Sequence, residues 1–124
     1  MIESKLLKRE EAKSLYDGNK IEFKENSEAM ALVDSGEMLC YCLFYIENGK
    51  ITIEKLSPEA DIMLCDGALR SALFIAANRG IMEAERKETV SGALIKRLGF
   101  SDNEENTFVD ITNLFSSCEN CKKD

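Results

Sequence analysis

The stretch EAMALVDSGEMLCYCLFYIENGKITIEKL, residues 28–56, carries the clearest fold signals in the chain. Two turn signals divide it, Asp34-Ser35-Gly36 and Asn48-Gly49. An Asn-Gly pair between two β-rich runs is the strongest short-range indication of a β-hairpin. These signals predict three strands, paired as an antiparallel meander, at about 28–33, 38–46 and 50–56.

The segments on either side of the meander alternate between helical and strand patterns. Before it, residues 4–16 predict a helix, at least over their second half, and residues 20–24 predict a short strand. After it, apolar residues repeat at helical spacing up to Ala77, and Gly80 follows as a stop signal. The remaining patterns predict a strand in IMEAERK (81–87), a helix at 89–98 and a closing strand in NTFVDITNLF (106–115). We therefore expect an α/β domain whose mixed, mostly antiparallel sheet is flanked by helices.

Composition excludes several function classes. The 124 residues suit a single domain with a short Cys-containing tail at about 116–124. A net charge of −7, from 16 basic and 23 acidic residues, disfavours nucleic acid as a partner. The absence of histidine excludes a Ser-His or Cys-His nucleophilic pair and any His-ligated metal. The sequence contains neither an apolar run of membrane-spanning length nor a signal-peptide core, so we expect a cytoplasmic protein with no membrane partner.

Two landmarks after the meander point to a known family. Leu56 and Pro58 close the last strand of the meander, and the later helix ends in Arg97-Leu98-Gly99-Phe100. Together with the order of elements over roughly residues 28–111, they make the chain resemble the GNAT (Gcn5-related N-acetyltransferase) family, in a divergent or degenerate form. The resemblance implies a GNAT-like fold, acetyl-CoA as cofactor, and direct transfer of its acetyl group to an unknown amine.

The resemblance also implies where acetyl-CoA would lie. The backbone of Leu56 and Ser57 would hold the thioester, and the backbone of residues 62–67 the pyrophosphate. The candidate cofactor-binding residues are Leu56, Ser57, Leu64, Cys65, Asp66, Gly67 and Ala68. The family's glycine-rich loop is altered here, because Asp61, Ile62, Leu64 and Asp66 stand at its arginine and glycine positions.

Two helix starts are compatible with this region. Asp66 is a good N-cap that would itself occupy the N–H groups a phosphate needs. Alternatively, Ser57-Pro58-Glu59 forms the first positions of a helix that replaces the loop altogether. Against both, Gly67 is retained, and backbone N–H groups bind phosphate without a glycine at every position.

The resemblance assigns the role of general base to a glutamate on the central strand, and Glu54 matches it in place and type. A substrate ammonium must lose a proton before its nitrogen attacks a thioester carbonyl. The alternative is an exposed strand glutamate without a catalytic role. Ile95 stands at the position of the family's tyrosine acid and cannot donate a proton, so Tyr45 is the substitute acid, or else a packing residue.

The cysteines offer a competing chemistry. Cys118-x-x-Cys121 is compatible with a redox pair or with half of a zinc site completed by Cys40 and Cys42. Cysteine in so apolar a strand also behaves as a small hydrophobe, and Cys65 is expected in the core. We expect no metal cofactor.

Three function classes therefore remain open. The first is an acetyl-CoA-dependent N-acetyltransferase, and the second is a non-catalytic GNAT-like binding or regulatory module with a protein partner. The third is a thiol or zinc protein that uses the tail cysteines. The sequence leaves the oligomeric state open, a homodimer included.

Overall fold

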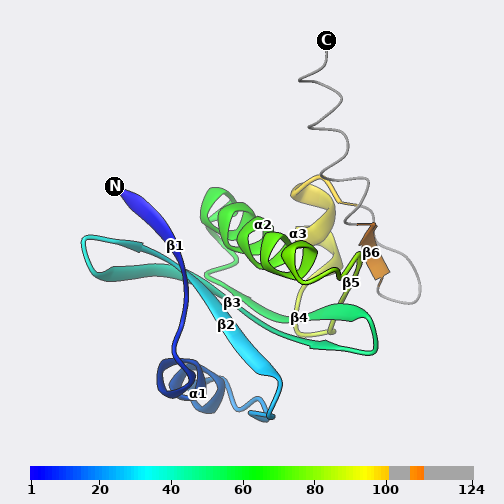
Figure 1. Cartoon of the computed structure of the whole chain (residues 1–124). Helices are drawn as coiled ribbons and strands as arrows, with labels where there is room; N and C mark the ends of the chain where they lie inside the picture. Colours follow the sequence, from blue (N-terminus) through cyan, green and yellow to red (C-terminus); the bar gives the residue numbers. More distant parts are fainter. Residues whose placement is uncertain (101–106, 111–124) are drawn as a thin grey trace.

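The computed structural model describes residues 1–100 and 107–110, and Figure 1 shows the whole chain. The described elements follow one another in the order β1 (Ile2–Leu6), α1 (Arg9–Gly18), β2 (Ser27–Asp34), β3 (Glu37–Glu47), β4 (Lys50–Ser57), α2 (Ile62–Asn78), β5 (Glu83–Arg86), α3 (Gly92–Arg97) and β6 (Thr107–Asp110). The predicted meander is confirmed as β2, β3 and β4, with hairpin turns in which Ser35, Gly36, Asn48 and Gly49 adopt positive φ.

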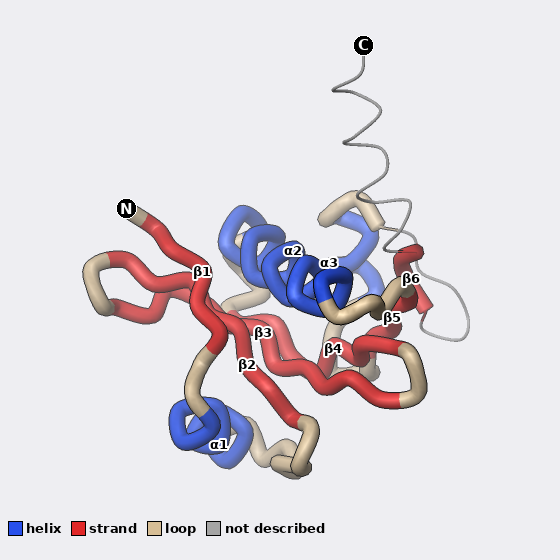
Figure 2. Tube along the Cα trace, in the orientation of Figure 1, coloured by secondary structure: helices blue, strands red, loops and turns tan. Residues whose placement is uncertain are grey.

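The strands described here form one six-stranded sheet in chain order, β1-β2-β3-β4-β5-β6 (Figure 2). Neighbouring strands are antiparallel except β4 and β5, which are parallel and joined through α2. The predicted α/β class with a mixed, mostly antiparallel sheet is therefore confirmed.

Both faces of the sheet are covered. On one face, α1 packs on Ala29, Ala31 and Leu43, which alternate with residues directed at the opposite face. On that opposite face, α2 and α3 cover a larger core that includes Met30, Cys42 and Ile53. Figure 1 shows α1 on one side of the sheet and α2 and α3 on the other. This two-sided burial explains why β2 and β3 are apolar along both faces.

Close packing holds α2 against the sheet. Gly67 lies inside α2, and a Cβ atom at this position would stand 2.9 Å from Leu32 Cδ1 of β2. Glycine here permits close approach between helix and strand. At the other end of α2, Arg79 pairs with Glu28 of β2, and Gly80 ends the helix at φ +82°.

Three local predictions were wrong. Residues 4–6 belong to β1 and not to a helix, because they pair in register with Met30 to Leu32 of β2, while the second half of the predicted segment is confirmed as α1. Residues 20–24 form no strand: they connect α1 to β2, and the Arg9 guanidinium donates to the carbonyl oxygens of Lys24 and Glu25 at the end of this connection. The helix expected at 89–98 begins later, with Ser91 as its N-cap.

Two further observations complete the outline. The closing strand is confirmed at Thr107–Asp110, and the rest of that prediction, residues 106 and 111–115, lies outside the described residues, as does the tail at 116–124. Among the residues that the structure describes, no helix has the length and apolar character required to cross a membrane.

Candidate functional site

Glu54 is the extra residue of a β-bulge in β4. Leu43 of β3 pairs with Lys55 and Phe44 pairs with Ile53, so Glu54 has no cross-strand partner. A bulge bends its strand and redirects side chains, and bulges are over-represented beside active sites. The Glu54 side chain is 4% exposed, which excludes the alternative of an exposed strand glutamate.

The partner of Glu54 is Tyr16, which α1 brings to the sheet. The Tyr16 side chain is fully buried, because Ala12 and Tyr16 form the inward face of α1. Its hydroxyl oxygen lies within hydrogen-bonding distance of three acceptors: Glu54 Oε1 at 2.9 Å, the Phe44 carbonyl oxygen at 2.9 Å and the Glu28 carbonyl oxygen at 3.1 Å. A phenol has one proton to donate, so it can serve one acceptor at a time.

This arrangement leaves Glu54 hydrogen bonded in both of its protonation states. When the carboxylate is charged, the Tyr16 hydroxyl donates to it. When the carboxyl is protonated, its own O–H donates to Tyr16, whose proton then goes to the Phe44 carbonyl oxygen. A proton can therefore arrive or leave without leaving the buried carboxyl unpaired.

Burial raises the pKa of Glu54 above the ordinary glutamate value. The hydrogen bond from Tyr16 and the charges of Lys87 and Lys24 oppose this rise in part, while Glu22 adds to it. Burial and the neighbouring Glu54 carboxyl raise the pKa of Tyr16, so this phenol stays protonated at neutral pH. A carboxylate with a raised pKa is a stronger proton acceptor than an exposed one.

Strands β4 and β5 separate next to the bulge. Their parallel pairing covers Lys50 to Ile53 of β4, and the Lys87 N–H donates to the Ile53 carbonyl oxygen at 2.8 Å. The Thr89 hydroxyl then donates to the Glu54 carbonyl oxygen. Leu56 and Ser57 lie beyond this point, where β4 is paired with β3 alone among the described strands. This is the place where the resemblance puts the thioester.

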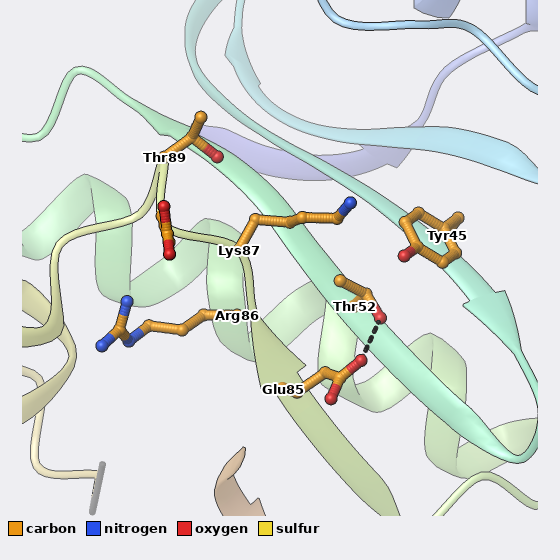
Figure 3. Close-up of a pocket in the computed structure, with 7 residues that line it drawn as sticks. Tyr45, Thr52, Glu85, Arg86, Lys87 and Thr89 are labelled. Atoms are coloured by element: carbon orange, nitrogen blue, oxygen red, sulfur yellow. Dashed lines mark hydrogen bonds between the residues drawn. The ribbon is translucent and has the colours of Figure 1, made fainter. Parts of the chain in front are cut away.

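A surface cavity of about 520 Å³ opens beside the split (Figure 3). Its lining comes from β3, β4, β5 and the following loop: Tyr45, Thr52, Glu85, Arg86, Lys87, Glu88 and Thr89. Thr52 donates to Glu85 at 3.1 Å, as the dashed line in Figure 3 marks. The cavity is joined to Glu54 through Thr89, which lines it and binds the Glu54 backbone.

Tyr45, the predicted substitute acid, lines this cavity and forms no hydrogen bond with Glu54. It is directly opposite Thr52 in the β3–β4 register. The Lys24 ammonium stands 4.0 Å from the centre of its ring, and the Lys87 ammonium stands 5.7 Å away. Two ammonium groups therefore lie near one phenol ring, in a cavity that Glu85 and Glu88 also line.

The start of α2 differs from both sequence predictions. The helix begins at Ile62, and Asp61 is its N-cap, with its carboxylate accepting the Leu64 N–H at 3.1 Å. The N-cap prediction for Asp66 was wrong, since Asp66 lies in the second turn and pairs with Arg70 at 2.9 Å. The alternative start at Pro58 was also wrong, because a turn at residues 59–60 precedes the helix.

The predicted phosphate-binding backbone is consequently occupied from Leu64 onward. The Cys65 N–H donates to the Asp61 carbonyl oxygen at 3.0 Å, and the N–H groups of 66–68 lie within the helical ladder. Cys65 and Ala68 are fully buried against the sheet, and Gly67 packs on Leu32. Within the 62–67 backbone that the resemblance assigns to the pyrophosphate, the N–H groups from Leu64 onward are bonded, while those of Ile62 and Met63 lie in the first turn, outside the helical ladder. The residues present do not fit that group as a glycine-rich loop does.

The described cysteines are core residues. Cys40, Cys42 and Cys65 are buried thiols, and burial raises the pKa of Cys65 to about 11. The described residues contain no group of His, Cys, Asp and Glu side chains arranged to hold a metal ion. Cys118 and Cys121 lie outside the described residues, so the tail chemistry stays a prediction. Ile95 is fully buried in the core.

Comparison of the sequence with protein-family models finds no match, and neither does comparison with curated proteins. Solved structures do match. An IAA acetyltransferase from Bacillus cereus superposes with a TM-score of 0.64 at 15% identity, covering 84% of this chain and 79% of that chain. The PaiA N-acetyltransferase from Thermoplasma acidophilum, in complex with coenzyme A, gives 0.59 at 15% identity, covering 88% and 96%. An acetyltransferase of the GNAT family from Staphylococcus aureus gives 0.58 at 8% identity, covering 84% and 87%.

The chain has the GNAT fold. The expectation drawn from Leu56, Pro58 and the Arg97–Phe100 stretch is confirmed at the level of the fold, and the low identities agree with a divergent form. Within this GNAT fold, the sequence analysis missed Tyr16. One signal was present: Ala12 and Tyr16 are four residues apart, so they share one face of α1.

Proposed function

We propose that this GNAT-fold protein is an N-acyltransferase that moves an acetyl group from acetyl-CoA to an amine, with Glu54 as the proton acceptor. One observation carries the proposal. A carboxyl group at a bulge, beside the opening between β4 and β5, keeps a hydrogen-bond partner whether or not it holds a proton. Burying a carboxyl group is costly, so its presence there favours a chemical role.

The residues perform a defined part of this reaction. Glu54 accepts one proton from the substrate ammonium, which frees the nitrogen lone pair for attack on the thioester carbon. The donor supplies an activated acyl carbon. As the C–N bond forms and the C–S bond breaks, the nitrogen gives up its second proton and the released thiolate takes one up, so the net proton of the reaction is the one that Glu54 accepts. Because Glu54 is 4% exposed, a water molecule relays the proton from the substrate to the carboxylate.

The structure offers different binding groups to the thioester arm and to the phosphates of acetyl-CoA. The backbone beyond the bulge, at Leu56 and Ser57, lies where β4 has no β5 neighbour in the described part of the chain. The start of α2 instead offers the acidic side chains of Glu59 and Asp61 and few free N–H groups. We expect the thioester arm to contribute more to donor binding than the phosphates do.

A non-catalytic GNAT-like module is the second candidate. The observation that favours it is the N-terminal turn of α2, where Asp61 occupies the N–H groups of Leu64 and Cys65. Such a module would keep the fold and lose the donor site. Its partner would be a protein or another small molecule.

Calorimetric titration of the reduced protein with acetyl-CoA, and with free CoA as the control, tests the proposal first. Acetylation of a panel of amines is then measured with acetyl-CoA and with the truncated donor S-acetyl-N-acetylcysteamine. Turnover of either donor, lost in Glu54→Gln and retained in the matched strand variant Glu83→Gln, supports acyl transfer. If the protein shows no binding at millimolar donor and no turnover of either thioester, the acyltransferase proposal is wrong and the non-catalytic module remains.

A further inference from the structure

Strand β1 is the edge of the described sheet, and all five of its residues are exposed. Its position at the rim is visible in Figure 2. Two of the five are large apolar residues, Ile2 at 52% and Leu6 at 38% exposure. Edge strands with exposed apolar residues are templates for pairing with another strand.

The backbone of β1 shows which groups are turned outward. The Leu7 N–H donates to the Ala29 carbonyl oxygen of β2 at 2.9 Å. Residues directed at a neighbouring strand alternate, so Glu3 and Lys5 also direct their N–H and C=O groups at β2. Ile2, Ser4 and Leu6 therefore direct theirs away from the sheet.

The sequence Ile2-Glu3-Ser4-Lys5-Leu6 is complementary to itself when a second copy runs antiparallel and is centred on Ser4. In this register Ser4 faces Ser4 and Ile2 faces Leu6, and these pairs are the outward-directed residues that can exchange backbone hydrogen bonds. Glu3 of each copy faces Lys5 of the other in a non-hydrogen-bonded pair, where side chains approach most closely. A register centred on Ile2 or Leu6 would leave part of β1 without a partner, whereas the register centred on Ser4 pairs all five residues.

Apolar contacts support the same register. Leu6 pairs with Met30, which faces α2, so Ile2 and Leu6 lie on the α2 side of the sheet. Pairing of two copies would place Ile2 of one beside Leu6 of the other, on the α2 side of the joined sheet.

We propose that the protein forms a twofold dimer in which β1 of one copy pairs antiparallel with β1 of a second copy, centred on Ser4, to give one continuous sheet. The partner is a second copy of this chain, because its charges and backbone groups match those of β1 in one register. A twofold contact uses the same surface on both copies and closes on itself, so it predicts a dimer and no longer assembly. This inference is independent of the proposed acyl transfer.

Sedimentation equilibrium of the full chain from micromolar to millimolar concentration tests it. We expect a monomer–dimer equilibrium that Ser4→Pro weakens at least about tenfold, because proline removes an outward-directed N–H while sparing the bonds to β2. A second variant, Glu3→Lys, changes a charge within β1 and is described below. Its control is Glu37→Lys, which makes the same change in charge at an exposed position outside β1. A monomer at every concentration, or a dimer that Ser4→Pro leaves unchanged, overturns the proposal.

A pair of charge-reversal variants distinguishes loss of the dimer contact from misfolding of a single variant. Glu3→Lys alone and Lys5→Glu alone each place like charges opposite one another, and both should be monomeric at concentrations where the parent protein is dimeric. Mixing the two variants restores Glu–Lys pairs at both positions, so the mixture should form a heterodimer. If the mixture stays monomeric while the parent is dimeric, β1 pairing in this register is wrong.

Discussion

The bulge in β4 and the first turn of α2 lie close together along the chain, and they treat polar groups in opposite ways. At the bulge, a carboxyl is buried and given a partner that can donate or accept, so its proton can be exchanged. At the helix start, the Asp61 side chain and the helical ladder occupy the N–H groups from Leu64 onward. The first region therefore holds a carboxyl group that can exchange its proton, and the second has few free backbone donors, although both belong to one GNAT fold. The fold alone therefore does not indicate whether a chain has the residues for proton transfer, those for phosphate binding, or both.

The largest expected effect comes from removing the carboxylate. If the protein transfers acyl groups, Glu54→Gln should lower kcat/KM by about a hundredfold or more, the usual contribution of a positioned general base. Glutamine keeps a hydrogen-bond partner for Tyr16, so circular dichroism should show an unchanged fold. Steady-state kinetics of both proteins, with Glu83→Gln beside them, measures the difference. Equal rates in Glu54→Gln and the parent would remove Glu54 from the reaction.

Tyr16→Phe should give the next largest effect, on stability. The variant keeps the ring packing and removes the hydroxyl that serves Glu54 and two carbonyl oxygens. A buried carboxyl left without its partner costs about 1–3 kcal/mol in the free energy of unfolding, which urea denaturation measures. Tyr41→Phe is the matched control, because its half-buried hydroxyl accepts a bond from Asn19 near the surface. A loss in the control as large as in Tyr16→Phe would show that neither hydroxyl is special.

Asp61→Ala tests the other region. Removal of the N-cap should lower the free energy of unfolding by about 1 kcal/mol. It also frees the Leu64 N–H and removes a negative charge, so binding of acetyl-CoA should become tighter in calorimetry. Asp17→Ala is the control, since Asp17 forms an exposed pair with Lys13. Unchanged or weaker acetyl-CoA binding in Asp61→Ala would mean that the cap does not limit the donor site.

The smallest expected effect is a dependence of the free energy of unfolding on pH. The folded-state pKa of Glu54 lies above the value of an unfolded glutamate, so its stabilising contribution is complete at a pH below the unfolded value. That contribution is lost as the pH rises through the folded-state pKa. The parent protein should therefore lose stability relative to Glu54→Gln as the pH increases from about 4 to 7. Thermal unfolding of both proteins across this range measures the difference, and parallel curves would contradict the raised pKa.

Local patterns predicted the fold where the deciding contacts are local. The Asn48-Gly49 turn set the hairpin of β3 and β4, and the periodicity up to Ala77 predicted α2. β1 was mistaken for helix because its partner strand begins more than twenty residues later, and no local pattern shows that pairing. The contacts of Arg9 with the carbonyl oxygens of Lys24 and Glu25, fifteen and sixteen residues away, are likewise not visible in a local pattern.

In the candidate site, too, the features set by local sequence were predicted and those set by tertiary packing were not. Glu54 was predicted from its type and place on the central strand, but its burial depends on a bulge and on Tyr16, both set by tertiary packing. The start of α2 was misplaced because Asp61 and Asp66 are equally good N-caps in sequence. Their choice depends on the packing of Cys65, Gly67 and Ala68 on the sheet, which requires those residues to lie inside the helix.

The Tyr16 hydroxyl has a practical consequence for spectroscopy. A phenol proton held in the interior among Glu28, Phe44 and Glu54 exchanges with solvent slowly enough to give its own proton resonance. Its chemical shift depends on whether the phenol donates to a carboxylate or to a carbonyl. One resonance therefore reports the protonation of Glu54 and the docking of α1 on three strands at the same time.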